Sequence, residues 1–206
     1  MDTYQILSHE ALNTLLGEPN EVVQQKIHDQ LDPEMREFIA AASLVFISTL
    51  DANGLPDISP KGDPAGFVAV HDNNTLSIPE RPGNKLMFGF HNVLNNPAIG
   101  LIFVIPNCRE TLRIKGKATL TQDPELLASL SVGDKPALLA TKVAVEECFF
   151  HCGKAMIRSK VWQPDTWGAT RKSLIAKQVA RQLDGGEEIE QFVESELEKN
   201  YVEELY

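Results

Sequence analysis

Three cations, Lys61, Arg81 and Lys85, stand in two segments rich in proline and glycine, SPKGDP at residues 59–64 and PERPGNK at residues 79–85. Loops that project from a rigid sheet hold their backbone in place, and a half-buried Lys or Arg in such a loop suits an anionic ligand. The residue types therefore predict a site for a small anion. The alternative interpretation is that these cations are solvent-exposed charges on the loops.

The two segments flank a predicted hairpin, which is the element that must position them. Residues 66–70 and 75–78 have the β-branched and apolar composition of strands, and HDNN at residues 71–74 has the composition of a turn. The strands of this hairpin need further sheet to pack against, so the rest of the chain is expected to build and close the site.

Length and composition place the chain among ordinary globular proteins. It has 206 residues, of which 43% are hydrophobic and 23% are charged, as expected for one domain with elaborations. No run approaches the roughly eighteen apolar residues of a membrane span. The N-terminal segment lacks the basic region and uninterrupted apolar core of a secretory signal, so we expect a cytoplasmic protein.

The formal net charge of −10 is unevenly distributed. Residues 1–40 hold eight acids against two bases, and residues 184–206 hold nine acids against Lys199 alone, whereas the centre of the chain is mildly basic. Nucleic-acid binding needs a concentrated basic face, which an acidic chain of this kind does not offer. A basic centre within an acidic protein indicates a small anionic ligand.

The first forty-two residues are predicted to be helical. Ser8 can cap a helix that ends at Gly17, and Asn20 can cap a second one over residues 21–28. Asp32-Pro33-Glu34 is a strong start signal for a third helix that runs to about Ala42. We expect residues 1–42 to form a helical segment that docks on the rest of the chain.

The centre of the chain reads as strands with mostly short connections. The predicted strands cover residues 43–50, 66–70, 75–78, 98–105, 111–120 and 142–150. A helix is expected over residues 84–95, and Gly116 is expected to mark a bulge or a close backbone approach. This pattern favours a small antiparallel barrel over residues 43–168.

Two further helices are predicted over residues 170–183 and 187–206, separated by the helix stop at Asp184-Gly185-Gly186. We expect residues 169–206 to pack on the barrel or on a dimer partner.

Four segments resemble the pyridoxamine 5′-phosphate oxidase-type flavoproteins. They are SPKGDPAGF at 59–67, IPERPGNK at 78–85, ETLRIKG at 110–116 and HCGKAMIRS at 151–159, and the resemblance extends over roughly residues 34–168. It implies a six-stranded antiparallel split β-barrel with N- and C-terminal helices, mainly β with α. It also implies a homodimer that binds FMN at the subunit interface.

The resemblance implies a set of cofactor-binding residues. By position they are Ser59, Pro60, Lys61, Ile78, Pro79, Glu80, Arg81, Asn84, Lys85, Thr111, Arg113, Arg158 and Trp162. The first three would line the cofactor, residues 78–81 would contact the flavin ring and then the phosphate, and Asn84 with Lys85 would begin a helix at the phosphate. A helix N-terminus beside a Lys suits an anion.

Thr111 and Arg113 match strand positions that would approach the flavin from the partner subunit, and Arg158 and Trp162 match a C-terminal segment near the ring. The alternative for Arg113 is the solvated face of an edge strand. For Trp162 it is a core or interface anchor.

The expected function is that of an FMN-dependent oxidoreductase acting on a small molecule, in which the cofactor supplies the redox chemistry. No general base stands out. The family's enzyme ends in a basic substrate-recognition segment, whereas this chain ends in ESELEKNYVEELY, which argues against pyridoxamine phosphate as the substrate.

Two alternatives remain open. One is a non-catalytic flavin-binding or interaction protein, and the other is a barrel that binds haem or a deazaflavin. Haem would need an axial ligand such as His71, His91 or His151.

The cysteines do not indicate a metal site. Cys148, His151 and Cys152 lack a second pair of ligands, and Cys108 is distant in the sequence. Reduced thiols are the expected state of all three cysteines, and Cys148 and Cys152 are expected to be buried.

Overall fold

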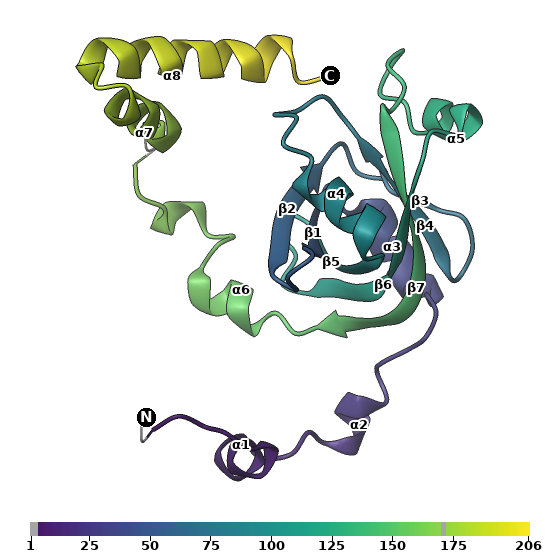
Figure 1. Ribbon diagram of the computed structural model, residues 1–206. Helices are drawn as coiled ribbons and strands as arrows, with labels where there is room; N and C mark the ends of the chain where they lie inside the picture. The colour runs from purple at the N-terminus through teal and green to yellow at the C-terminus, as the bar shows by residue number, and fades with distance from the viewer. Residues whose placement is uncertain (1–3, 170–171) are drawn as a thin grey trace.

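The computed structural model describes residues 4–169 and 172–206. Within these residues the centre of the molecule is a seven-stranded sheet with the strand order β2-β1-β5-β6-β7-β4-β3, in which every neighbouring pair is antiparallel (Figure 1). The strands are β1 (Leu44–Leu50), β2 (Pro56–Gly62), β3 (Ala69–Val70), β4 (Thr75–Glu80), β5 (Ala98–Val104), β6 (Thr111–Thr121) and β7 (Leu139–His151).

The sheet curls around one hydrophobic core but is not closed by backbone pairing. β2 and β3 form its two edges, and the described residues show no hydrogen-bonded pairing between these edges. The expected six-stranded barrel is therefore replaced by a curled, open sheet of seven strands with helices around it, a mixed α/β architecture.

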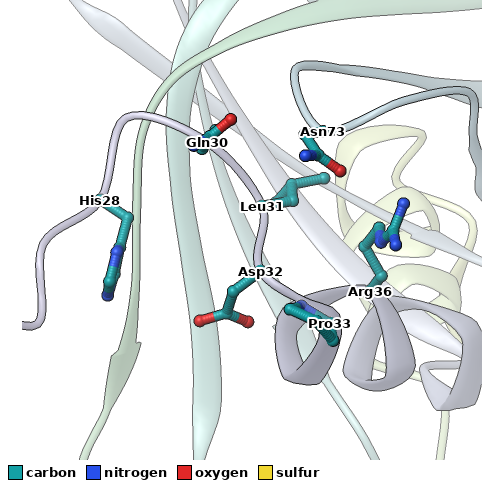
Figure 2. Close-up of a pocket in the computed structure, with 7 residues that line it drawn as sticks. All are labelled: His28, Gln30, Leu31, Asp32, Pro33, Arg36 and Asn73. Atoms are coloured by element: carbon teal, nitrogen blue, oxygen red, sulfur yellow. The ribbon is translucent and has the colours of Figure 1, made fainter.

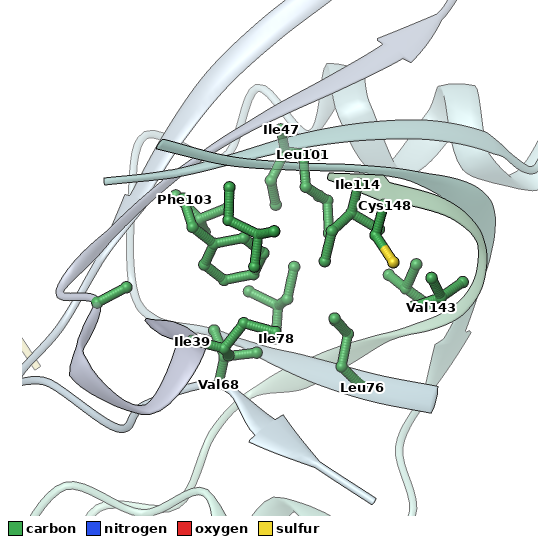
Figure 3. Close-up of a cluster of buried hydrophobic side chains, with 14 of the residues drawn as sticks. Ile39, Ile47, Val68, Leu76, Ile78, Leu101, Phe103, Ile114, Val143 and Cys148 are labelled. Carbon is green, nitrogen blue, oxygen red and sulfur yellow. The ribbon is translucent and has the colours of Figure 1, made fainter. Parts of the chain in front are cut away.

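The core fills the concave side of this sheet. Inward-facing side chains from five strands and from helix α3 (Pro33–Ala41) point toward one another, among them Phe103, Ile114 and Ile39 (Figure 3). Alternate residues of each strand face inward, as the two-residue period of a strand requires. The fully buried Phe103 and Leu112, for example, are cross-strand partners.

Strand β2 lies where the sequence indicated a loop. Pro60 has no N–H to donate and lowers the expectation of a strand, but β2 is an edge strand with only β1 as its neighbour. Its exposed and half-buried residues alternate strictly, which places Ser59 and Lys61 on the inner side and Pro60 on the outer side.

Helix α4 (Phe88–Asn95) begins four residues later than predicted. Met87, the residue before it, is in the left-handed conformation and makes no side-chain cap, so the segment from Pro82 to Met87 is an exposed loop. α4 packs against β1, β2 and β6. Helix α5 (Pro124–Ser129) is capped by Asp123 as its sequence predicts.

The predicted irregularity at Gly116 is confirmed, because the β6–β7 register shifts between Lys115 and Gly116. The predicted start of α3 is confirmed as well: the Asp32 side chain accepts a hydrogen bond from the Met35 backbone N–H at 2.7 Å.

The N-terminal segment extends away from the sheet, whereas the C-terminal helices leave the sheet and α8 runs back toward it, so that the C-terminus lies near the sheet (Figure 1). At the N-terminal end lie α1 (His9–Leu16) and α2 (Glu21–Gln24), followed by a β-bridge between His28 and Cys148. At the C-terminal end lie α6 (Lys154–Ser159), the 3₁₀ helix η1 (Pro164–Thr166), α7 (Leu174–Gln182) and α8 (Gly186–Glu203). None of the helices in the described residues combines the length and apolar character that crossing a bilayer requires.

Candidate functional site

Two ion pairs join the opposite sides of the curled sheet. Lys61 Nζ lies 2.6 Å from Glu80 Oε2, and Arg81 Nε lies 2.7 Å from Asp63 Oδ2. Lys61 belongs to the edge strand β2, whereas Glu80 ends β4, the strand beside the opposite edge. We call these four residues the edge cluster. Side chains, rather than a strand ladder, thus bridge the gap between the sheet edges here.

The Arg81–Asp63 pair is buried but incompletely satisfied. The side chains are only 13% and 2% exposed, and Arg81 Nη2 also donates to Leu130 O at 2.7 Å. Arg81 Nη1 and Asp63 Oδ1 are buried without a hydrogen-bond partner among the described residues. A buried polar group left unpaired costs about 1–3 kcal/mol. Arg81 therefore retains a donor that an anionic ligand could satisfy.

Lys61 is held by an aromatic ring as well as by a carboxylate. Its Nζ lies 5.2 Å from the ring centroid of Phe90 on α4, a distance at which the ring face attracts a cation. Helix α4 thus fixes the position of the Lys61 ammonium group beside Glu80.

The loop from Pro82 to Met87 carries Asn84 and Lys85. Lys85 and Met87 have positive φ angles of 58° and 56°, a strained conformation for residues other than glycine. Asn84 Oδ1 accepts from the Leu86 backbone N–H at 3.0 Å, which tightens the turn. Lys85 is exposed and has no ion pair in the part of the chain that the structure describes.

The expectation that Asn84 and Lys85 open a helix is wrong, since α4 starts at Phe88. A carboxylate already approaches the first turn of α4, because a Cβ on Gly89 would lie 3.7 Å from Asp57 Oδ2. Any anion near Lys85 would therefore be bound by the loop rather than by the helix N-terminus.

Tyr206, which follows α8, contacts the same region. Lys135 Nζ donates to Tyr206 O at 2.6 Å. The hydroxyl of Tyr206 approaches Asp63, and this hydrogen-bonding contact, followed by burial, raises the pKa of the phenol. Asp63 Oδ1 nevertheless lacks a hydrogen bond of good geometry.

Sequence reasoning missed Asp63, Phe90, Leu130, Lys135 and Tyr206. For Asp63 a signal was present. It stands two residues after Lys61, and alternate residues of a strand face the same side, so Asp63 is expected on the inner side with Lys61. The other four reach the edge cluster only through long-range packing.

Pro60 and Arg113 lie on the other side of the sheet from Lys61. The strand registers place Pro60, Phe46, Ile102, Arg113 and Phe149 in one row across β2, β1, β5, β6 and β7, which we call the outer row. Phe46 and Ile102 are large exposed hydrophobic residues. Arg113 Cζ lies 5.3 Å from the Phe149 ring centroid, so the aromatic ring of a neighbour in the outer row fixes the position of the Arg113 guanidinium group.

The remaining β-strand residues of the predicted site are less accessible. Ile78 and Pro79 are buried in β4, Thr111 is buried at the start of β6, and Ser59 is half-buried beside Lys61. β3 pairs only with Leu76 and Ser77, so beyond Ser77 this side of the β4 backbone has no neighbouring strand within the described residues.

Arg158 and Trp162 lie apart from the edge cluster. Arg158 is exposed on α6, and the Trp162 indole N–H donates to Cys108 O at 2.7 Å. In this structure Trp162 anchors the segment after α6 to the β5–β6 connection.

The three cysteines are free thiols with different exposure. Cys148 is buried and Cys108 is half-buried, but Cys152 is exposed, so the prediction of buried thiols is wrong for Cys152. The Cys148 thiol donates to Gln30 O at 3.2 Å, and burial raises its pKa to about 11. No group of three or more His, Cys, Asp or Glu side chains that could hold a metal ion occurs in the described residues.

A pocket of about 270 Å³ lies beside the segment that contacts Cys148, and none of the edge-cluster residues lines it (Figure 2). It is lined by His28, Gln30, Leu31, Asp32, Pro33, Arg36 and Asn73. Its polar groups have structural partners: Asp32 caps α3, and Leu31 N donates to Asn73 O at 2.7 Å. His28 and Arg36 lie at opposite ends of the pocket in Figure 2, so they do not converge on a common ligand.

Comparison with known proteins gives one family. Residues 31–152, more than half of the chain, match the family described as pyridoxamine 5′-phosphate oxidase. No curated protein matches the chain.

Several solved structures are similar to part of the chain. HupZ from Group A Streptococcus is 22% identical, with a TM-score of 0.46 over 58% of this chain and 93% of that one. A Clostridium acetobutylicum protein related to general stress protein 26 of B. subtilis is 18% identical, with a TM-score of 0.45 over 58% and 86%. An FMN-binding protein from Syntrophomonas wolfei subsp. wolfei is 13% identical, with a TM-score of 0.41 over 56% and 86%.

Proposed function

The chain belongs to the pyridoxamine 5′-phosphate oxidase family, and on this premise we propose that it binds FMN and acts as an FMN-dependent oxidoreductase on a small molecule. The observation that carries the proposal is that Arg81 Nη1, beside the strained loop that bears Lys85, is buried without a hydrogen-bond partner among the described residues. Strained backbone that the surrounding structure maintains is common where a protein clamps a ligand.

The residues present fit the phosphate of FMN. The edge cluster is neutral as a whole, since its two cations face two carboxylates, and Lys85 adds an exposed positive charge four residues after Arg81. A phosphate group would accept from Arg81 Nη1 and from Lys85, and each charge-assisted hydrogen bond of this kind is stronger than a neutral one. Asn84 would hold the loop in shape through its bond to Leu86.

The strand β4 fits a flat ring system. The side chains of Ile78 and Pro79 are buried, so their contribution would come from the backbone along the side of β4 that lacks a neighbouring strand in the described residues. Ser59 and Lys61 would border the ring from the facing edge strand β2. The flavin, when bound, supplies the redox chemistry, while these groups bind it, orient it and exclude water.

We further propose that the protein is a homodimer in which the outer row of one copy faces the cofactor of the other. Within one chain, Pro60 and Arg113 lie on the opposite side of the sheet from Lys61, Glu80 and Arg81. A second copy would bring the two sets together. The exposed Phe46 and Ile102 in the outer row give this face the apolar character of an interface.

The test is a titration of the purified protein with FMN, followed by flavin absorbance and fluorescence. Lys85→Ala and Arg81→Lys should each weaken FMN binding by about 1–3 kcal/mol, or roughly five- to 150-fold in Kd. The matched control is Lys117→Ala, which removes an exposed cation whose partner is Glu146, remote from the edge cluster.

A wild-type protein that takes up no FMN would overturn the proposal, as would unchanged affinity in both variants. A Soret band on addition of haem, without flavin uptake, would move the assignment to haem. If the flavin of the FMN-loaded protein is not reduced by NADH, NADPH or another supplied electron donor, the proposed FMN binding stands and the proposed enzymatic activity is overturned.

A further inference from the structure

Two cations approach one aromatic ring on the outer side of the sheet. Lys26 Nζ lies 5.5 Å from the centroid of the Phe149 ring, and Arg113 Cζ lies 5.3 Å from the same centroid. The two cationic groups are therefore at most about 11 Å apart, the sum of these distances. All three residues are half-buried. We call Lys26, Arg113 and Phe149 the Phe149 site.

The fold brings the two cations to the ring from the two sides of β7. Arg113 on β6 is the cross-strand partner of Phe149. On the other side of β7, His28 N donates to Cys148 O at 3.0 Å and Cys148 N donates to His28 O at 2.8 Å. Lys26 lies in the N-terminal arm, the segment that precedes α3, two residues before His28. Because Phe149 directly follows Cys148, this bridge fixes Lys26 beside the ring.

Neither cation has a counter-ion in the residues that the structure describes. The ion pairs found there involve neither Lys26 nor Arg113. Glu147, which stands two residues before Phe149 on β7, already binds Lys115 at 2.6 Å. Two like charges beside one ring repel each other, and this repulsion is stronger where water is partly excluded. The Phe149 site thus carries a positive charge that an anion would neutralise.

The ring of Phe149 also favours an anion at its rim. The face of an aromatic ring is negative and attracts cations, whereas its edge is positive. An anionic group at the outward edge of this ring would therefore meet the positive edge and lie between the two cations. The flexible stem of Lys26 lets its ammonium group reach such an anion, and the Arg113 guanidinium can donate two parallel hydrogen bonds to a carboxylate or a phosphate.

We propose that Lys26 and Arg113 bind the carboxylate or phosphate group of the small molecule on which the protein acts. The inference rests on the proposed function, in which the outer row of one copy faces the cofactor of the other. Arg113 and Phe149 belong to this row, so an anion at the Phe149 site of one copy would lie beside the flavin of its partner. Lys26 lies outside the residues 31–152 that match the family, so the family match does not imply its contribution.

The experiment measures the binding of two probes, inorganic phosphate and succinate, by isothermal titration calorimetry at constant ionic strength. The protein is first saturated with FMN, so that the phosphate site proposed at Arg81 and Lys85 is filled. Lys26→Gln and Arg113→Gln should each weaken the binding of at least one probe roughly tenfold, because each removes a charge-assisted hydrogen bond. The FMN affinity of Lys26→Gln should stay within about twofold of wild type.

The matched control is Lys142→Gln, which should leave the affinity for both probes unchanged. Lys142 is an exposed cation on the same strand and has no ion pair within the described part of the chain. It stands seven residues before Phe149, which places it roughly 20 Å away along the strand.

The proposal is overturned if the wild type binds neither probe, or if both variants bind the probes as the wild type does. It is also overturned if Lys26→Gln loses FMN affinity as strongly as probe affinity, because the two cations would then bind the phosphate of the cofactor. A protein that takes up no FMN is titrated in the Lys85→Ala background instead, which weakens the competing phosphate site. Failure of the cofactor assignment is thus distinguishable from failure of the Phe149 site.

Discussion

Cys148 connects the N-terminal arm to the sheet through its thiol. The thiol donates to Gln30 O at 3.2 Å, and the carbonyl oxygen of His28 lies 3.7 Å from Sγ. Burial raises its pKa to about 11, with further contributions from the negative charges of Asp32, Asp29 and Glu147. The protonated thiol is therefore favoured in the folded protein far more than in the unfolded chain.

This shift predicts a pH dependence of stability. The thiol ionises at a higher pH in the folded state, so its stabilising contribution is complete below the unfolded pKa of about 9 and is lost as the pH rises toward 11. Between pH 8 and pH 10.5 the wild type should lose about 1–2 kcal/mol more unfolding free energy than Cys148→Ala. Urea denaturation at the two pH values measures the difference. Cys152→Ala, at an exposed position, should follow the wild type, and parallel losses in all three proteins would contradict the assignment.

At the scale of single elements, the register of the longest strand pair depends on Gly116. A Cβ at this position would lie 2.0 Å from Ala144 O, which belongs to the backbone of the neighbouring strand. Gly116→Ala should therefore force β6 and β7 apart and destabilise the protein by about 1–3 kcal/mol, as overpacking does elsewhere.

Thermal unfolding followed by circular dichroism measures this effect. Gly100→Ala in β5 is the matched control, because its Cβ would meet only Ser48 Cβ at 3.8 Å, an ordinary contact. Equal melting temperatures for the two variants would show that the register at Gly116 tolerates a side chain.

The sequence predicted those elements whose signals are local. Strand β1 was expected over residues 43–50 and spans Leu44–Leu50, and the Asp-Pro start signal of α3 was correct. β2 was missed because Pro60 argues against a strand unless the strand is known to be an edge. The start of α4 was placed too early because the left-handed conformation of Lys85 and Met87 is imposed by the fold, not by residue type.

The candidate site was predictable only in part. Lys61, Glu80 and Arg81 could be singled out as chemistry-bearing residues, and the structure does bring them together. Their pairing partners could not be derived from spacing, because the ion pairs connect strands on opposite sides of the sheet. Tyr206 is farther still, since it reaches Asp63 only through the path of the C-terminal helices.

At the scale of the whole molecule, we expect the central sheet to bind the cofactor and the C-terminal helices to contribute to dimerisation. Deletion of residues 187–206 removes α8 and the contact of Tyr206 with Asp63 but keeps the sheet and the four side chains of the edge cluster. FMN affinity should therefore change by less than about threefold, whereas the proposed dimer should dissociate at a concentration roughly tenfold higher. Flavin titration and light scattering on the same protein provide the two measurements. Complete loss of FMN binding would mean that α8 forms part of the cofactor site.

The bridge between His28 and Cys148 also bears on how the protein is synthesised. The two residues are 120 positions apart. At a translation rate of roughly 5–20 residues per second, Cys148 leaves the ribosome roughly 6–24 s after His28. The contacts of Asp29 and Leu31 with the turn at residues 73–74 can form earlier, whereas the contact of His28 with Cys148 has to wait until β7 has been made. The base of the N-terminal segment is consequently fixed in two stages, and the second follows the synthesis of β7.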